Sequence, residues 1–236
     1  MEFEAKAAKG LDHKALVSYD ISLERLKMAG YERHASPAEA FSLLIDNLEG
    51  KLKGKYKAVA EDMLDDSGEW MSMAVERKGN TLICYLHPEG LAWDKEKKIY
   101  MHDGFNHSGM QECAISGKES TMWRPLDQFG NDFVKLLYGR SYNDLPEEMK
   151  EDISCAVNVC KTQVYLPPED GNIWPVYRSN NNPLCVVCYK ADGGASRGVR
   201  EKPVVSAKKP NARQNNPAMP TSTLPGSFRA EHHLRG

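Results

Sequence analysis

Apolar residues recur at helical spacing through the first part of the chain, and this pattern predicts three amphipathic helices over residues 12–30, 36–52 and 56–68. The first is expected to begin at an Asp12 cap and to end at Gly30, a residue type that favours the position after a helix. The second begins with a capping box, in which Ser36 and Glu39 can bond each other's backbone amides.

From Trp70 onward the pattern changes to alternation, which is typical of strands. Two such runs flank Gly79-Asn80, so we expect a hairpin with Val75 facing Cys84. This register makes Cys84 a core thiol and places His87 opposite Ser72 on the other face. That second face is half apolar, so another part of the chain should cover it.

Shorter elements are predicted further along the chain. We expect helices over residues 131–139 and 144–160, and the predicted strands are 98–102, 111–115, 162–166, 173–178 and 184–190. There is no internal repeat and no alternating β-α series. The sequence therefore predicts an α+β fold, with N-terminal amphipathic helices followed by a small, mainly antiparallel sheet and further helices.

Charge divides the chain into two parts. Residues 191–236 hold eight Lys or Arg against three Asp or Glu, which gives this segment a net charge of +5. Because the whole chain has a net charge of −2, residues 1–190 carry a net charge of −7. The late segment has little apolar periodicity and cannot bury enough surface to offset its ordering entropy. We predict one globular domain over 1–190 and a disordered basic tail over 191–236.

Composition narrows the class of protein. With 236 residues, 41% of them hydrophobic and 27% charged, the chain is typical of a globular protein. Its longest apolar runs have five or six residues, at 82–86 and 184–189, whereas a membrane helix needs roughly 20. The N-terminus lacks the apolar stretch of a secretory signal. We therefore expect no membrane association and a cytoplasmic location.

One loop carries candidate catalytic chemistry. His102, Asp103 and His107 could bind a divalent metal or hold a general base, and Cys113 could form a Cys-His pair with them. The alternative is a surface turn, in which Asp103 and Asn106 bond their own backbone. The Gly, Asn and Ser residues around these side chains favour the turn.

The late cysteines match the ligand count of a zinc site. Cys155, Cys160, Cys185 and Cys188 are four thiols, and zinc in a reducing compartment selects thiolates. The spacing argues against the site, because Cys155 and Cys160 would lie about 140° apart on a helix. Cys185 and Cys188 would point to opposite faces of a strand. Core and surface thiols are the favoured interpretation.

Three hypotheses about function follow. The first is a non-enzymatic binding or regulatory protein that engages a protein partner through its acidic domain, with an exposed apolar patch around Trp93, Trp123 or Trp174. The second is a hydrolase that uses His102, Asp103, His107 and Cys113. The third is a zinc protein that binds nucleic acid through the basic tail. We place the first ahead because no catalytic group of residues has convincing spacing.

Overall fold

The structure is a computed structural model, and it describes residues 2–3, 17–65, 68–115, 123–150, 154–155, 158–159, 163–167, 171–179, 185–188 and 195–200. These residues belong to one compact unit, Met1–Lys202. Its helices are α1 (Tyr19–Met28), α2 (Pro37–Leu48), α3 (Gly54–Asp65), α4 (Asn131–Tyr138) and α5 (Glu147–Lys150), with single 3-10 turns at η1 (Leu126–Gln128) and η2 (Tyr142–Asp144).

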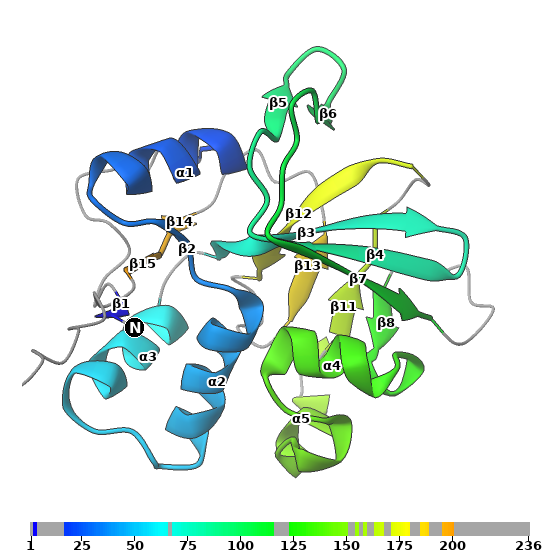
Figure 1. The fold of residues 1–236 in the computed structure, drawn as a ribbon. Helices are drawn as coiled ribbons and strands as arrows, with labels where there is room; N and C mark the ends of the chain where they lie inside the picture. The colour runs from blue at the N-terminus through cyan, green and yellow to red at the C-terminus, as the bar shows by residue number, and fades with distance from the viewer. Residues whose placement is uncertain are drawn as a thin grey trace, which may run out of the picture. The chain divides into compact units, whose positions relative to one another are not determined.

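The central sheet has eight strands, and seven follow the order β7-β4-β3-β12-β13-β11-β8 while β14 pairs with β3 (Figure 1). Pairing is antiparallel except for β11 with β13 and β14 with β3. The strands are β3 (Glu69–Lys78), β4 (Thr81–Leu86), β7 (Gly109–Ala114), β8 (Trp123–Pro125), β11 (Gln163–Tyr165), β12 (Ile173–Arg178), β13 (Val186–Cys188) and β14 (Ala195–Ser196). The expected α+β fold with a mainly antiparallel sheet is confirmed.

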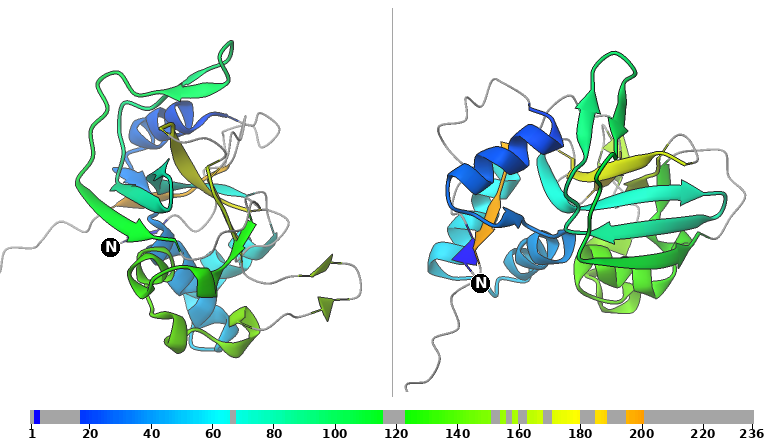
Figure 2. Two further views of the ribbon diagram at one scale, coloured as in Figure 1. Left: turned by 90° about the vertical axis from the view of Figure 1, so that its right-hand side faces the viewer. Right: turned by 45° about the horizontal axis from the view of Figure 1, so that its top comes forward.

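Smaller sheets complete the described structure. One joins distant parts of the chain in the order β1-β15-β2. The other two are two-stranded, β5 with β6 and β9 with β10, and the β5-β6 hairpin stands out from the central sheet in both views of Figure 2. Their strands are β1 (Glu2–Phe3), β2 (Arg33–His34), β5 (Ala92–Asp94), β6 (Ile99–Met101), β9 (Ser154–Cys155), β10 (Asn158–Val159) and β15 (Gly198–Arg200).

The β3-β4 hairpin has the predicted register. Val75 pairs with Cys84 and Lys78 with Thr81, which leaves Gly79-Asn80 as the two-residue turn. Both faces of β3 are buried from Glu69 to Glu76. The second face is covered by Tyr19 of α1 and Tyr100 of β6, whose rings lie edge-on to Trp70 at 5.9 and 6.3 Å. The expectation that another part of the chain covers this face is therefore confirmed.

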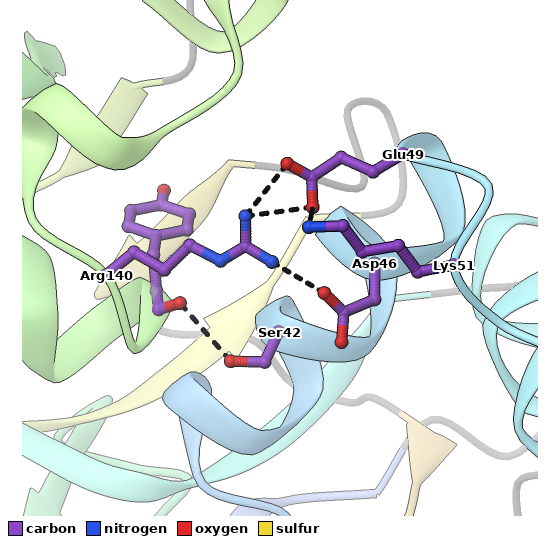
Figure 3. Close-up of polar contacts among 6 residues, drawn as sticks. Ser42, Asp46, Glu49, Lys51 and Arg140 are labelled. Atoms are coloured by element: carbon purple, nitrogen blue, oxygen red, sulfur yellow. Dashed lines mark hydrogen bonds and ion pairs between the residues drawn. The ribbon is translucent and has the colours of Figure 1, made fainter.

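Helices α2 and α4 pack against each other and are joined by polar contacts (Figure 3). The α2 capping box forms as predicted, and Ser36 N–H donates to Glu39 Oε2 at a distance of 2.7 Å. At the other end of α2, Arg140 binds Asp46 at 2.5 Å and Glu49 at 2.9 Å. Gly139 ends α4 with a φ of 69°, and a Cβ there would lie 2.6 Å from Ser42 Oγ, so a side chain at this position would be strained and would displace Ser42.

Two predicted helices are corrected. Helix α1 begins at Tyr19 rather than after Asp12, because Ser18 is its extended N-cap and Val17 already lies in an isolated β-bridge. The helix predicted over 144–160 shrinks to α5, and β9 and β10 follow it. The apolar residues between 145 and 160 are compatible with helical spacing and also with the alternation of a strand. In the structure Cys155 pairs with Asn158 in antiparallel strands, so the strand pattern is the one adopted there.

The predicted start of the basic tail is also corrected. Residues 195–200, assigned from composition to a disordered tail over 191–236, form β14 and β15 within the folded unit. Strand β14 pairs with β3, and β15 pairs with both β1 and β2. The remaining tail, 201–236, lies outside the described residues. Strand pairing supplies the order that the local sequence lacks.

Arg197 explains why this short segment is held. Its guanidinium is fully buried and binds Glu69 at 2.6 Å and Asp62 at 2.9 Å. Glu69 is 2% exposed, so its charge needs a buried counter-ion. The side chain that composition assigns to a solvated tail is therefore an internal ion-pair partner of β3 and α3.

Replacing this buried cation should destabilise the fold strongly. We expect Arg197→Met to lower the free energy of unfolding by about 3–5 kcal/mol, because Glu69 would lose its hydrogen-bonded cation and keep only Arg178, whose Nη2 lies 3.8 Å away. Urea denaturation measures the loss. Lys57→Met is the matched control, since Lys57 pairs with Glu61 at 3.5 Å on the exposed side of α3 and should cost under about 0.5 kcal/mol. Equal losses in the two variants would contradict the ion-pair explanation.

The core thiol gives a second stability prediction. Cys84 is fully buried, and its hydrogen bond with Cys113, together with burial, holds the thiol pKa above its ordinary value. Cys84→Ser should lower the free energy of unfolding by roughly 1–3 kcal/mol, because a more polar hydroxyl replaces the thiol in an apolar site. Thermal denaturation checks this, and an unchanged melting temperature would refute the core assignment.

Candidate functional site

A polar pocket of about 260 Å³ lies where three segments of the chain meet. The first segment is Glu32 with Arg33 of β2, the second is residues 87–89 directly after β4, and the third is residues 106–108 directly before β7. The lining residues are Glu32, Arg33, His87, Glu89, Asn106, His107 and Ser108. Two imidazoles, two carboxylates and an amide in one concave site make this pocket the candidate functional site.

Backbone hydrogen bonds hold two of these segments together. Glu89 N–H donates to Asn106 O at 2.9 Å, and Asn106 N–H returns a bond to Glu89 O at 3.0 Å. Ser108 N–H donates to Leu86 O at 2.9 Å. The pocket wall is therefore a continuation of the β4-β7 pairing.

His87 has an unusual backbone conformation, with a φ of 50°. Few residues other than glycine adopt this region, and the strain persists only where the surroundings impose it. Ser72 supplies that constraint, because its carbonyl accepts the His87 N–H at 3.1 Å and its hydroxyl lies 2.8 Å from Nδ1. Ser72 is 1% exposed, so it orients the imidazole and is not placed to attack a substrate.

His107 is held by aromatic rings and by one side-chain contact. Its ring centroid lies 5.2 Å from that of Tyr85 and 5.7 Å from that of Phe105. Its backbone N–H donates to Asn106 Oδ1 at 2.9 Å, which is the self-bonding turn predicted for Asn106. Its Nδ1 is buried without a hydrogen-bond partner. The imidazole is half-buried and presents a fixed ring to the pocket.

Arg33 lies in the opposite wall, but its charge is already neutralised. Nη1 and Nη2 each bind one oxygen of Glu39 at 2.7 Å. Nη1 also donates to His34 O at 3.1 Å. Burial opposes ionisation of Glu39, yet the bonds from Arg33 and from Ser36 N–H hold the pKa of its carboxyl below the ordinary value. This bidentate pair leaves the Arg33 fork engaged with a carboxylate of the protein.

The remaining charges of the pocket are acidic. Glu89 is ion-paired with Lys27 at 2.5 Å, and both side chains are about half exposed. Glu32 is exposed and has no ion-pair partner among the residues described. The two ion pairs are each neutral overall, so Glu32 is the carboxylate of the pocket that no described ion pair neutralises.

The structure separates the four residues of the predicted hydrolase site. Only His107 lines the pocket, while His102 and Asp103 are exposed in the turn after β6. Cys113 is 4% exposed on β7, and Cys84 is the thiol with which it shares a hydrogen bond. Strand β7 pairs with β4 and β6 with β5, so the two ends of the loop belong to different sheets.

The candidate zinc ligands are placed in part. Cys155 lies in β9, Cys160 falls outside the described residues, and Cys185 and Cys188 are buried free thiols at β13. Within the ranges that the structure describes, no three His, Cys, Asp or Glu side chains are grouped so as to hold a metal ion. The helical spacing used against the site no longer applies, because Cys155 lies in a strand.

The tryptophans do not form the predicted exposed patch where their side chains are described. Trp174 is fully buried, and Trp93 is half-buried with its ring 5.0 Å from Tyr100. The side chain of Trp123 lies outside the described set. Any binding role assigned to the described structure therefore starts from the polar pocket.

Sequence reasoning missed most of the pocket. The hairpin register placed His87 opposite Ser72, which the structure confirms, but no local signal marked His87 as part of a site. Glu32 and Glu89 look like ordinary surface charges in the sequence. They meet only because β2 is brought beside the end of β4, a long-range arrangement that a single sequence does not encode locally.

His34, next to Arg33, shows how tightly β2 is packed. Its ring is fully buried, Nε2 lies 2.8 Å from Ser22 Oγ, and Nδ1 has no hydrogen-bond partner. Burial lowers the pKa of His34 from 6.5 to about 3. The imidazole is thus neutral in the folded protein, and protonation would oppose folding.

No family model, no curated protein and no solved structure matches this chain. Within the described residues, none of the helices combines the length and the apolar character needed to span a bilayer.

The buried histidine predicts how stability varies with pH. Because the pKa of His34 is about 3 when folded and about 6.5 when unfolded, the unfolded chain binds a proton first as pH falls below 6.5. This group should remove about 2 kcal/mol of stability between pH 7 and pH 5. Urea denaturation at both values should show a pH-dependent loss smaller by that amount in His34→Gln. An identical pH dependence in the two proteins would contradict the assignment.

Proposed function

We propose that this chain is a non-enzymatic binding protein whose folded unit engages a protein partner through the pocket between β2 and the ends of β4 and β7. The observation that carries the proposal is the preformed pocket of about 260 Å³, whose walls are held by backbone pairing and by the Ser72-His87 contact. Preformed walls lower the ordering cost of binding. The volume suits one side chain of a partner.

The chemistry of the pocket supports binding ahead of catalysis. Ser72, which contacts His87, is buried beneath the imidazole. The thiols with described side chains, at positions 84, 113, 185 and 188, are all buried and none lines the pocket. A covalent mechanism needs an accessible nucleophile within reach of its base. The hydroxyl that lines the pocket, that of Ser108, donates to Leu86 O at 3.2 Å rather than to an imidazole.

A photo-cross-linking experiment tests the proposal in an extract of the source cells. Glu32, at the pocket, and Glu96, exposed in the β5-β6 turn, would each be replaced by p-benzoylphenylalanine in the full chain. We expect a discrete protein adduct from position 32 and not from position 96, because only the former lies in the proposed contact. Mass spectrometry identifies the adduct.

Competition distinguishes a specific contact from random capture. An excess of the unmodified protein should suppress the adduct. Ser108→Trp should compete poorly, since an indole at position 108 would fill the pocket. Equal adducts from positions 32 and 96, or full competition by Ser108→Trp, would overturn the proposal.

A further inference from the structure

The charge of the pocket indicates which side chain it can accept. Arg33, His87 and His107 could suggest an anion site, because such groups bind phosphate and carboxylate. Both Arg33 terminal nitrogens are, however, bonded to Glu39 at 2.7 Å, and this carboxylate also accepts Ser36 N–H in the α2 capping box. An entering anion would have to displace a carboxylate that helps to begin α2.

The acceptors of the pocket are more accessible than its cation. Glu32 is exposed and without an ion-pair partner in the described structure, and Glu89 is paired only with the half-exposed Lys27. An ion pair between exposed side chains contributes little, so Lys27 can be exchanged at small cost. Two carboxylates from opposite walls can therefore face a group that enters between them.

The imidazole of His107 adds a flat surface to these acceptors. It is fixed by Tyr85 and Phe105 and lines the pocket, so it offers a ring surface beside the carboxylates. A planar guanidinium stacks on such rings and donates in several directions, whereas a phosphate does neither.

We infer that the pocket accepts a basic side chain of the partner, with a guanidinium between Glu32 and Glu89. This inference rests on the proposed function and specifies the chemistry of that same contact. Lys27 is displaced from Glu89, the Arg33-Glu39 pair stays intact, and the negative charge of the pocket is neutralised on binding.

The probe is N-acetyl-arginine-N-methylamide, titrated into the full-length ¹⁵N-labelled protein at pH 7.5 and followed by amide NMR shifts. We expect saturable shifts confined to the lining residues. The citrulline analogue has nearly the same shape without the charge and should bind at least about fivefold more weakly. Raising the salt concentration should weaken the arginine response, because the contact is partly exposed.

Matched variants localise the effect. Glu32→Gln should weaken arginine binding by about fivefold, because it removes the unpaired carboxylate. Glu96→Gln, an equal change of charge outside the pocket, should leave binding unchanged. Thermal denaturation of both variants shows whether the fold is retained.

Other outcomes would overturn the inference in distinct ways. Equal binding of the arginine and citrulline probes would refute charge recognition while leaving the pocket as a binding site. Shifts caused by inorganic phosphate and not by arginine would show that the site takes an anion. A lack of response to every probe would refute the basic side chain, and the cross-linking result would still decide the proposed function independently.

Discussion

The buried contact of Arg197 with Glu69 and Asp62 is the interaction on which the rest of the described structure depends. It anchors the segment that contains β14 and β15 against β3. Strand β15 then pairs with β2, and the β2 segment donates and accepts further bonds with Arg197 and Ser72. Arg197, which is far from β2 in the sequence, thus helps to fix the position of Glu32 and Arg33. These two residues form one wall of the pocket.

The other wall has a different origin. It extends the β3-β4-β7 part of the sheet, whose register is set by the Gly79-Asn80 turn and by burial of both faces of β3. The positive φ of His87 is tolerated there because Ser72 holds both the backbone and the ring. The pocket therefore lies where two sets of strand pairs meet, both of them joined to β3, which accounts for a preformed shape without a single dominant loop.

The internal ion pairs also limit what the pocket can bind. Arg33 is committed to Glu39 and stabilises the beginning of α2, so it contributes structure more than recognition. The accessible acceptors are the exposed carboxylate of Glu32 and the half-exposed carboxylate of Glu89, where solvent weakens each charge contact. Such a site favours modest affinity and relies on shape and on additional contacts around the pocket for specificity.

The sequence by itself determined the local elements: the α2 capping box, the β3-β4 register, the Gly139 end of α4 and the α+β class. These follow from periodicity and from residues that act on near neighbours. Tertiary structure alone decided that 195–200 is folded, that 154–155 pairs with 158–159, and that His107 lines a pocket with His87 while Cys113 bonds Cys84. The physical reason is that strand pairing and buried charge pairs join residues far apart in the chain, and such partners leave no periodic signal in either segment.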